Sequence, residues 1–462
     1  MIKFLNTLTH RIEDFHPITQ GEVRMYTCGP TVYSYAHIGN FRTFLFEDLL
    51  RRFLKFSGLR LTQVMNITDV DDKTIRDSKA AGQSLRDFTE KYTEAFFSDI
   101  ATLGAERAEI YPRATDHIDE MVTLIKKLLE SGHAYEKDSS IYYRIKSFPS
   151  YGRLSGINPD DLQDGISSDV DEYEKESPKD FALWKTAKEG EPFWETEIGP
   201  GRPGWHIECS AMSMKYLGES FDIHTGGVDN IFPHHENEIA QSEAVAGKPF
   251  VKYWLHCQHL IVEGEKMSKS KGNFFTLRDL LADGVDPMAI RYLLLSVHYR
   301  QMMNFTRNGL EGAASSLRRL TDFLRSIRDT TFVEKNTGDL SPVIKEARRR
   351  FIDAMESDLN SSGALGAIFE LVRDVNTALQ RDGVTRVEAA QIESLFSDFN
   401  RVFGVLVPPK TVDDQDILQL IEERKGARAR RDWKRADEIR EKLQRLGIIL
   451  EDAAKGTRFK RV

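Results

Sequence analysis

A histidine and an asparagine, three residues apart, precede a stretch whose apolar residues recur at helical spacing. The stretch covers residues 41–56, and His37-Ile38-Gly39-Asn40 separates it from a predicted strand at 23–27. A helix start offers unpaired N–H groups and the positive end of the helix dipole, which favour an anion. Gly39 permits close approach of a phosphate, and His37 and Asn40 could face the same phosphate oxygens as charge moves during adenylyl transfer. A polar helix cap is the alternative that this segment leaves open.

A second candidate for phosphate binding is a lysine-rich segment in the second half of the chain. It reads Lys266-Met267-Ser268-Lys269-Ser270 and continues as Lys271-Gly272-Asn273. Its ammonium groups could close over a triphosphate, and Lys266 and Lys269 could neutralise departing pyrophosphate. A solvated surface loop is the alternative. The sequence has neither a Walker A motif nor GxGxxG, so binding of ATP would require another phosphate-binding device such as this pair of segments.

The chain has three cysteines, Cys28, Cys209 and Cys257. An odd number in 462 residues suits a reducing compartment better than a disulfide framework, so metal-bound thiolates become the interesting hypothesis. For Cys28 alone, a buried structural thiol is the simpler interpretation. Cys257 lies in the apolar run WLHCQHL and is expected in the core.

Two further metal-ligand types stand four residues apart in a predicted helix. His234 and Glu238 therefore share one face of that helix, and two of the cysteines could flank the same rim of the fold. Two thiolates, an imidazole and a carboxylate would complete a tetrahedral zinc site. Spacing leaves a competitor, because His235 is three residues before Glu238 and could face the same way. His234 alone could be a satisfied core histidine.

The elements that must position these residues begin with a strand, a helix and a strand at 23–27, 41–56 and 61–67. This order predicts a parallel α/β sheet, in which ligands bind at the carboxyl ends of the strands. Cys28 and Thr68 would both lie at that edge. Helices are expected at 85–103 and 115–131, strands at 139–143, 220–224 and 253–262, and a further helix at 234–245.

The rest of the chain is mostly helical apart from one irregular stretch. Residues 149–203 are rich in Gly, Pro, Asp and Ser, and they are interpreted as an insertion between two halves of a catalytic domain. Helices are expected at 288–297, 309–328, 342–358, 363–381 and 387–403. The expected parts are a Rossmann-like catalytic first half at 1–148, the insertion at 149–203, the second half with the metal site and lysine-rich segment at 204–287, a helical region at 288–335, a helical bundle at 336–407, a linker at 408–417 and a small module at 418–462.

Composition sets the class of protein. With 40% hydrophobic and 29% charged residues, the chain suits a soluble protein of several domains, and its start has no long apolar run or cleavage site. No signal peptide or membrane anchor is therefore expected. The net charge of −8 hides a basic end, because residues 418–462 contain 14 Lys and Arg against 8 Asp and Glu. This end could bind RNA or could be a solvated, salt-bridged helix.

Taken together, the two phosphate-binding segments suggest a family. HIGN followed by KMSKS resembles the paired signatures of class I aminoacyl-tRNA synthetases, although the usual first signature ends in a second histidine where Asn40 stands. An amide can still donate a hydrogen bond to phosphate, but it cannot become cationic. Further stretches resemble cysteinyl-tRNA synthetases in particular: YTCGPTVY, NITDVDDK, PGWHIECSAMS, FDIHTGGVDNIFPHHENEIAQSEA and ADEIREKLQRLGIILED.

This resemblance implies a set of roles for individual residues. It selects Cys28, Cys209, His234 and Glu238 as ligands of one Zn²⁺ ion. It also implies an amino-acid pocket formed by Thr68, Trp205 and His224, and a nucleotide site that includes Gly39, Gly226, Gly227, Asp229 and Lys269. Trp205 could instead be ordinary core, and the glycines could only make a turn.

The activity implied by the resemblance is the ATP-dependent attachment of L-cysteine to tRNA(Cys). The expected chemistry is adenylate formation from Mg²⁺-ATP, with His37 and Asn40 on the phosphate and Lys266 and Lys269 on pyrophosphate. The helical regions would bind the tRNA stem and the basic module its anticodon, in a cytoplasmic monomer. Zinc would select a thiolate over the harder hydroxyl of serine, and the insertion is too short for a large editing domain. A cysteine:amino-sugar ligase of mycothiol synthesis and a non-catalytic tRNA-binding paralogue are the rival hypotheses.

Overall fold

The computed structural model describes residues 1–158, 177, 179–268, 272–334, 338–406, 414–430, 432–445, 448–453 and 456–461. The chain divides into two compact units, Met1–Val405 and Leu406–Val462. Within the described residues, no helix is both long enough and apolar enough to cross a membrane.

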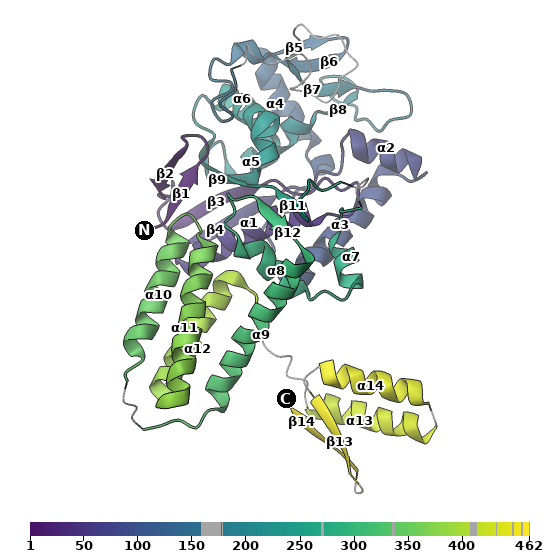
Figure 1. Cartoon of the computed structure of the whole chain (residues 1–462). Helices are drawn as coiled ribbons and strands as arrows, with labels where there is room; N and C mark the ends of the chain where they lie inside the picture. Colours follow the sequence, from purple (N-terminus) through teal and green to yellow (C-terminus); the bar gives the residue numbers. More distant parts are fainter. Residues whose placement is uncertain are drawn as a thin grey trace. The chain divides into compact units, whose positions relative to one another are not determined.

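A four-stranded parallel sheet lies at the centre of the first unit, as the sequence predicts (Figure 1). Its strands in spatial order are β10 (Val251–Cys257), β9 (Phe221–Gly227), β3 (Glu22–Thr27) and β4 (Arg60–Met65). The two inner strands are buried along most of their length, which is typical of a parallel sheet covered by helices on its faces. His224 is paired with Tyr26 on one side and Trp254 on the other, so the carboxyl ends of the strands share one edge.

The sheet is covered by helices that the chain forms between strands. Helix α1 (Ile38–Phe56) connects β3 to β4 and contacts β4, β9 and β10. Helices α4 (Ile118–Glu130), α5 (Trp205–Leu217) and α6 (Glu236–Ala246) pack against one another, and α5 also contacts β3 and β4. This packing brings residues that are distant in the sequence to the carboxyl edge of the sheet.

Several elements differ from the sequence predictions. Helix α1 begins at Ile38, three residues before the predicted start, because His37 and Asn40 cap it reciprocally. The predicted strand at 253–262 is two strands: after β10 the chain leaves the central sheet, and β11 (Leu260–Val262) pairs with β12 (Met303–Phe305). Helix α5 was not predicted. Nine of its thirteen positions are buried in the packed core, and such a helix has no continuous polar face to give a periodic signal.

The remaining elements of the catalytic unit surround this core. A second, antiparallel sheet has the order β5 (Ala134–Lys137), β6 (Ser140–Tyr143), β7 (Phe181–Thr186) and β8 (Gly201–Pro203), so it includes two strands upstream of residue 149. The other elements are β1 (Lys3–Asn6), β2 (Arg11–Asp14), α2 (Asp72–Ala80), α3 (Leu85–Thr102) and α7 (Leu277–Ala282).

Five helices follow, close to the predicted ranges: α8 (Pro287–Ser296), α9 (Arg307–Asp329), α10 (Ser341–Glu356), α11 (Ser361–Arg381) and α12 (Arg386–Phe403). Buried Arg291 of α8 joins this bundle to the catalytic core, because it donates to the Phe403 carbonyl and pairs with Asp48 of α1. The second unit consists of α13 (Asp414–Ala429), α14 (Trp433–Arg445) and a hairpin of β13 (Ile448–Ala453) and β14 (Gly456–Arg461).

Candidate active site and metal centre

Four candidate metal donors meet at the carboxyl edge of the central sheet. Cys28 follows β3, Cys209 lies in α5, His234 lies in the turn before α6, and Glu238 lies in α6. Their donor atoms all lie within 4.8 Å of one another. Cys28 is half-buried, and the other three are at most 1% exposed. The structure thus brings together the four residues that the family resemblance selects.

A second set of donors overlaps the first one. Cys28, His224, His235 and Glu238 also place one donor atom each within 4.8 Å of the others. His235, the competitor that the spacing left open, has its Nε2 atom 3.2 Å from the Cys28 sulfur and its Nδ1 atom 2.8 Å from Nε2 of His256. Soft metals such as zinc favour thiolates, so the set with two cysteines is the better zinc site.

The charges in the cluster are those expected of a cation site. A hydrogen bond with Cys28 lowers the pKa of Cys209 to about 6, against the opposing effect of burial. Burial acts to raise the pKa of Glu238, but His224 and His234 bring it down to about 2. The Oε1 atom of Glu238 is fully buried and accepts no hydrogen bond, although Nε2 of His234 lies 3.1 Å away. Cys209 and Glu238, with its unsatisfied oxygen, are therefore favoured as anions facing the space that a cation would occupy, whereas the pKa of Cys28 is raised and that of His234 is raised to about 10.

His206 supports the cluster through its contact with His234. The His206 Nδ1 atom is 2.9 Å from Nδ1 of His234, and burial lowers the pKa of His206 well below its usual value, so a neutral His206 can accept from His234. Such a partner fixes which nitrogen of a ligating histidine faces the metal. Sequence reasoning missed His206. Its position three residues before Cys209 in GWHIEC is the signal that could have indicated it.

Two of the three predicted pocket residues contact the cluster, Trp205 through His234 and His224 through Glu238. The Trp205 ring stacks on His234 with the ring centres 4.1 Å apart, and Trp205 is 37% exposed, so it can also reach a ligand. His224 is fully buried, and its Nε2 atom is 3.0 Å from Oε2 of Glu238. Thr68 is 1% exposed and accepts a hydrogen bond from the Asn66 side chain. Trp205 and His224 therefore adjoin the candidate metal donors directly.

Another acidic residue in this segment anchors the chain beside the cluster. The buried carboxylate of Glu236 accepts hydrogen bonds from the backbone N–H groups of Gly152, Leu154 and Ser155, and from the Ser155 hydroxyl. The Tyr151 hydroxyl donates to the side chain of Asn237, the residue after Glu236. The loop at 151–155 is thus fixed to the first turn of α6, which carries Glu238. Nothing in the sequence spacing distinguishes Glu236 from a metal ligand.

His37 and Asn40 form a reciprocal cap at the start of α1. The Asn40 Oδ1 atom accepts from the His37 N–H group at 3.1 Å, and the His37 Nδ1 atom accepts from the Asn40 N–H group at 3.3 Å. A neutral His37 then carries its proton on Nε2, and Asn40 keeps its side-chain NH₂ group for a ligand. Capping and phosphate binding are therefore compatible at Asn40, because its side chain uses the oxygen for the helix and retains the NH₂ group as a donor.

The lysine-rich segment and the two residues that follow it contact the start of α1. The Ile38 N–H group donates to the Phe275 carbonyl, and the His37 ring contacts the Phe274 ring edge-on. A side chain at Gly39 would place its Cβ 2.9 Å from the His37 ring and 3.4 Å from the Met267 methyl group, so only glycine fits without displacing them. Lys266 is exposed. Lys269 lies outside the described residues.

The predicted nucleoside residues lie at the carboxyl end of β9, with Gly226 and Gly227 in the strand and Asp229 in the turn after it. A Cβ at Gly226 would lie 2.8 Å from the His235 ring, and one at Gly227 would lie 2.3 Å from the Asp229 carboxylate. Packing against these neighbours accounts for both glycines by itself. Asp229 is exposed at the carboxyl edge of the sheet, where a ligand could reach it.

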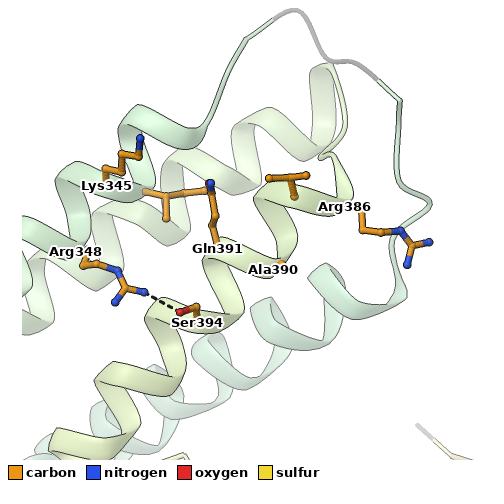
Figure 2. A pocket seen from close by; sticks show the side chains of 8 residues that line it. Lys345, Arg348, Arg386, Ala390, Gln391 and Ser394 are labelled. Carbon is orange, nitrogen blue, oxygen red and sulfur yellow. Dashed lines mark hydrogen bonds between the residues drawn. The ribbon is translucent and has the colours of Figure 1, made fainter.

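Two further features lie outside this site. Cys257 is 1% exposed, and burial raises the pKa of its thiol to about 12, as suits a core residue. A pocket of about 540 Å³ lies between α10 and α12, with Lys345, Arg348 and Arg386 on its walls (Figure 2). Arg348 donates to the Ser394 hydroxyl and pairs with Asp398. None of the predicted catalytic residues lines this pocket.

Comparisons with known proteins agree with the site geometry. The model of the tRNA synthetases class I (C) catalytic domain matches residues 14–315, the DALR domain matches 350–407, and the cysteinyl-tRNA ligase anticodon binding domain matches 414–459. These matches define a class I aminoacyl-tRNA synthetase. The chain is 50% identical to a cysteine-tRNA ligase of Solibacter usitatus over 463 residues, with 100% of this chain and 99% of the relative covered.

A cysteine-tRNA ligase of Brachyspira hyodysenteriae is also 50% identical, with the same coverage. The chain belongs to the cysteinyl-tRNA synthetase family. Among solved structures, a Mycobacterium tuberculosis methionyl-tRNA synthetase in complex with methionyl-adenylate matches with a TM-score of 0.60 and 14% identity, covering 83% of this chain and 90% of that one. An Agrobacterium radiobacter LeuRS in a ternary complex gives a TM-score of 0.60 at 11% identity, covering 85% of both chains. At these identities the likeness shows the fold alone.

Proposed function

We propose that this enzyme activates L-cysteine with ATP and transfers it to tRNA(Cys). The observation that carries the proposal is the convergence of Cys28, Cys209, His234 and Glu238 beside Trp205 and His224. Two thiolates, an imidazole and an unsatisfied carboxylate oxygen fit a Zn²⁺ ion. When bound, the ion would coordinate a substrate thiolate and would discriminate against the hydroxyl of serine.

The protein groups then act on the phosphates. The carboxylate of cysteine attacks the α-phosphorus of Mg²⁺-ATP, forming cysteinyl adenylate and releasing pyrophosphate. His37 and Asn40 donate hydrogen bonds to the phosphate oxygens as charge moves between them, and Gly39 leaves room for this approach. Lys266 and Lys269 neutralise the leaving pyrophosphate, while Gly226, Gly227 and Asp229 lie along the nucleoside. No covalent enzyme intermediate is involved.

In the second step, a terminal ribose hydroxyl of the tRNA attacks the carbonyl carbon of the adenylate, and AMP leaves. Residues 288–335 are assigned to the stem of the tRNA, the bundle at 336–407 to its body, and the module at 418–462 to the anticodon. The basic groups beside the α10–α12 pocket, Lys345 and Arg386, support RNA binding by the bundle (Figure 2). The enzyme acts in the cytoplasm as a monomer.

The rival hypothesis is a ligase that joins cysteine to an amino sugar. Such an enzyme would not need an anticodon module, so the family match at 414–459 favours tRNA as the substrate. The deciding measurement is ATP-pyrophosphate exchange with each amino acid, followed by charging of purified tRNA. Exchange that depends on cysteine, without charging of tRNA, would favour the amino-sugar ligase. Absence of exchange with every amino acid would favour the non-catalytic paralogue.

Removal of the second compact unit, residues 406–462, should separate the two steps. We expect cysteine-dependent exchange to stay near the parent rate, because the metal cluster and the capped helix lie wholly in the first unit. Charging of tRNA should fall by roughly tenfold or more, since the contacts with the unpaired anticodon bases are lost. A folded, truncated enzyme that charges tRNA normally would show that the module does not bind it.

A further inference from the structure

Glu208 is a fully buried carboxyl group that the proposed mechanism does not use. It lies in α5, directly before Cys209, and it is 0% exposed. Neither of its oxygens accepts a hydrogen bond. A carboxyl group that is removed from water normally has a partner, because desolvation without one is unfavourable. Glu208 is therefore a candidate for a group that pairs with something brought by a ligand.

The other buried carboxyl groups near the metal cluster already have partners. Glu238 contacts His224 and His234, and Glu236 accepts four hydrogen bonds from the 152–155 loop. Asp69 accepts from the backbone and the hydroxyl of Thr115, and Glu47 accepts from the Thr225 hydroxyl. Among these neighbours in the described part of the chain, Glu208 alone has two unpartnered oxygens.

Thr68 connects Glu208 to the proposed amino-acid pocket. The Thr68 hydroxyl lies beside the buried Glu208 carboxyl group and can turn its hydrogen toward it. The Thr68 oxygen already accepts from the Asn66 amide at 3.0 Å. The orientation of that amide is fixed in turn, since its oxygen accepts from the Gly29 N–H group at 2.9 Å.

These contacts determine what Thr68 can offer to a ligand. A hydroxyl has one hydrogen and two lone pairs. If the hydrogen points toward Glu208 and one lone pair receives Asn66, the second lone pair remains to accept from a donor in the pocket. The arrangement suits a cationic N–H group, because a carboxylate stands directly behind the accepting oxygen.

We propose that Glu208 is the positioning residue and counter-charge for the α-ammonium group of the amino-acid substrate, acting through Thr68. This inference rests on the proposed function, in which the thiol of cysteine is held beside Cys209. In cysteine three bonds separate the sulfur from the nitrogen, a distance on the order of 3–4 Å. A substrate anchored at the cluster through sulfur therefore carries its ammonium group within the neighbourhood of the residue that adjoins Cys209.

The assignment divides recognition between two groups. The metal donors recognise the side chain, which distinguishes cysteine from serine. Glu208 and Thr68 recognise the ammonium group, which both amino acids have. Neutralising Glu208 should consequently weaken binding of cysteine without changing the preference for cysteine over serine.

The test uses Glu208→Gln and two thiol ligands that differ in the amino group. Cysteine is measured through its KM in ATP-pyrophosphate exchange, and 3-mercaptopropionate, which has the thiol and the carboxylate but no amine, is measured as a competitive inhibitor. We expect the KM for cysteine to rise by roughly tenfold to a hundredfold, the scale of one lost charge-assisted hydrogen bond. The inhibition constant of 3-mercaptopropionate, the KM for ATP and the zinc content should stay within about twofold of the parent.

Four further variants sharpen the result. Thr68→Val should produce the same selective loss, and the double variant should lose no more than the larger single loss, because both residues act on one group. Glu208→Asp keeps the charge and should restore part of the affinity for cysteine. Glu120→Gln is the matched control. Glu120 of α4 pairs at the surface with Lys215 of α5, the helix that carries Glu208.

Equal losses for cysteine and 3-mercaptopropionate in Glu208→Gln, or no loss for either, would overturn the assignment. If Glu208→Gln does not fold, the same comparison is made with Thr68→Val and Glu208→Asp. Activity of the parent enzyme distinguishes a failure of the Glu208 assignment from a failure of the proposed function. Cysteine-dependent exchange by the parent, combined with equal losses in the variants, removes the role of Glu208 and leaves the proposed function standing.

Discussion

The candidate metal donors come from separate elements, and Cys209, His234 and Glu238 are nearly removed from solvent. His37 and Asn40 are instead neighbours at the start of one helix and remain accessible. The first group depends on the packing of α5 and α6 against the sheet, and the second depends on a local cap. Selection of a small side chain benefits from a rigid, water-poor site, where electrostatic and coordination differences are large. A site for a nucleotide that enters and leaves must stay open until a loop closes over it.

The strongest test of this contrast is Cys209→Ala, which removes a thiolate from the buried cluster. We expect loss of tightly bound zinc and of detectable cysteine-dependent exchange, because the remaining donors cannot hold the ion in a closed tetrahedral site. ATP binding should persist, since the helix start does not depend on Cys209. Metal content would be measured by elemental analysis and nucleotide binding by calorimetry.

Cys257→Ala provides the matched control for this variant. It removes a buried thiol that lies outside both donor sets, so it should retain zinc. Full retention of zinc by a folded Cys209→Ala variant would instead favour the set of Cys28, His224, His235 and Glu238.

Asn40→Ala tests the exposed site in the same way. The substitution removes the side-chain donor and the cap on the His37 N–H group, so adenylate formation should slow by roughly tenfold to a thousandfold. Cysteine affinity and zinc content should change little. Pre-steady-state formation of adenylate is the measurement, with the fold checked by circular dichroism.

Asn40→His is the companion variant, because an imidazole N–H group can occupy similar space and should keep much of the activity. An alanine variant as fast as the parent would show that Asn40 is only a helix cap. The phosphate would then be stabilised by His37, the backbone and the lysine-rich segment.

The smallest effect is expected for Glu238→Gln. Two cysteine thiolates would still anchor the ion, so Glu238 should be the most dispensable of the four donors, and His224 can still contact the amide. We expect cysteine binding to weaken by about tenfold, with ATP binding nearly unchanged. Calorimetric titration of both ligands against the same zinc-loaded preparation decides this, and equal weakening of the two would contradict the separation of the sites.

The contrast between the buried metal donors and the local helix cap also explains how much could be predicted from the sequence. The strand, helix and strand around HIGN follow from local patterns, and a helix cap needs only neighbouring residues, so both the parallel sheet and this site could be predicted. The spacing of His234 and Glu238 predicts that they meet, and they lie 3.1 Å apart. It could not choose between His234 and His235, because both face the cluster once α6 packs, and only the resemblance selected one.

Residues that act through packing gave no usable signal. Helix α5 is buried on nearly all sides, so its apolar residues show no stripe, and with it His206 and Glu208 were missed. Strands β7 and β8 lie in a segment whose Gly and Pro content predicted irregular chain, and they join the sheet because β7 pairs with β6, which is distant in the sequence, and β8 pairs with β7. The contacts of Glu236 with Gly152, Leu154 and Ser155 have the same origin.

The contacts of Glu236 also bear on how this region moves. A loop without regular structure normally exchanges its amide hydrogens with water quickly, because local opening requires little free energy. Here the amides of Gly152, Leu154 and Ser155 donate to one buried carboxylate on α6. They can exchange only when that carboxylate is uncovered, which means separating the loop from the helix that carries Glu238. These three amides should therefore exchange as slowly as those of α6 itself, and the loop and the helix should open as a single cooperative unit.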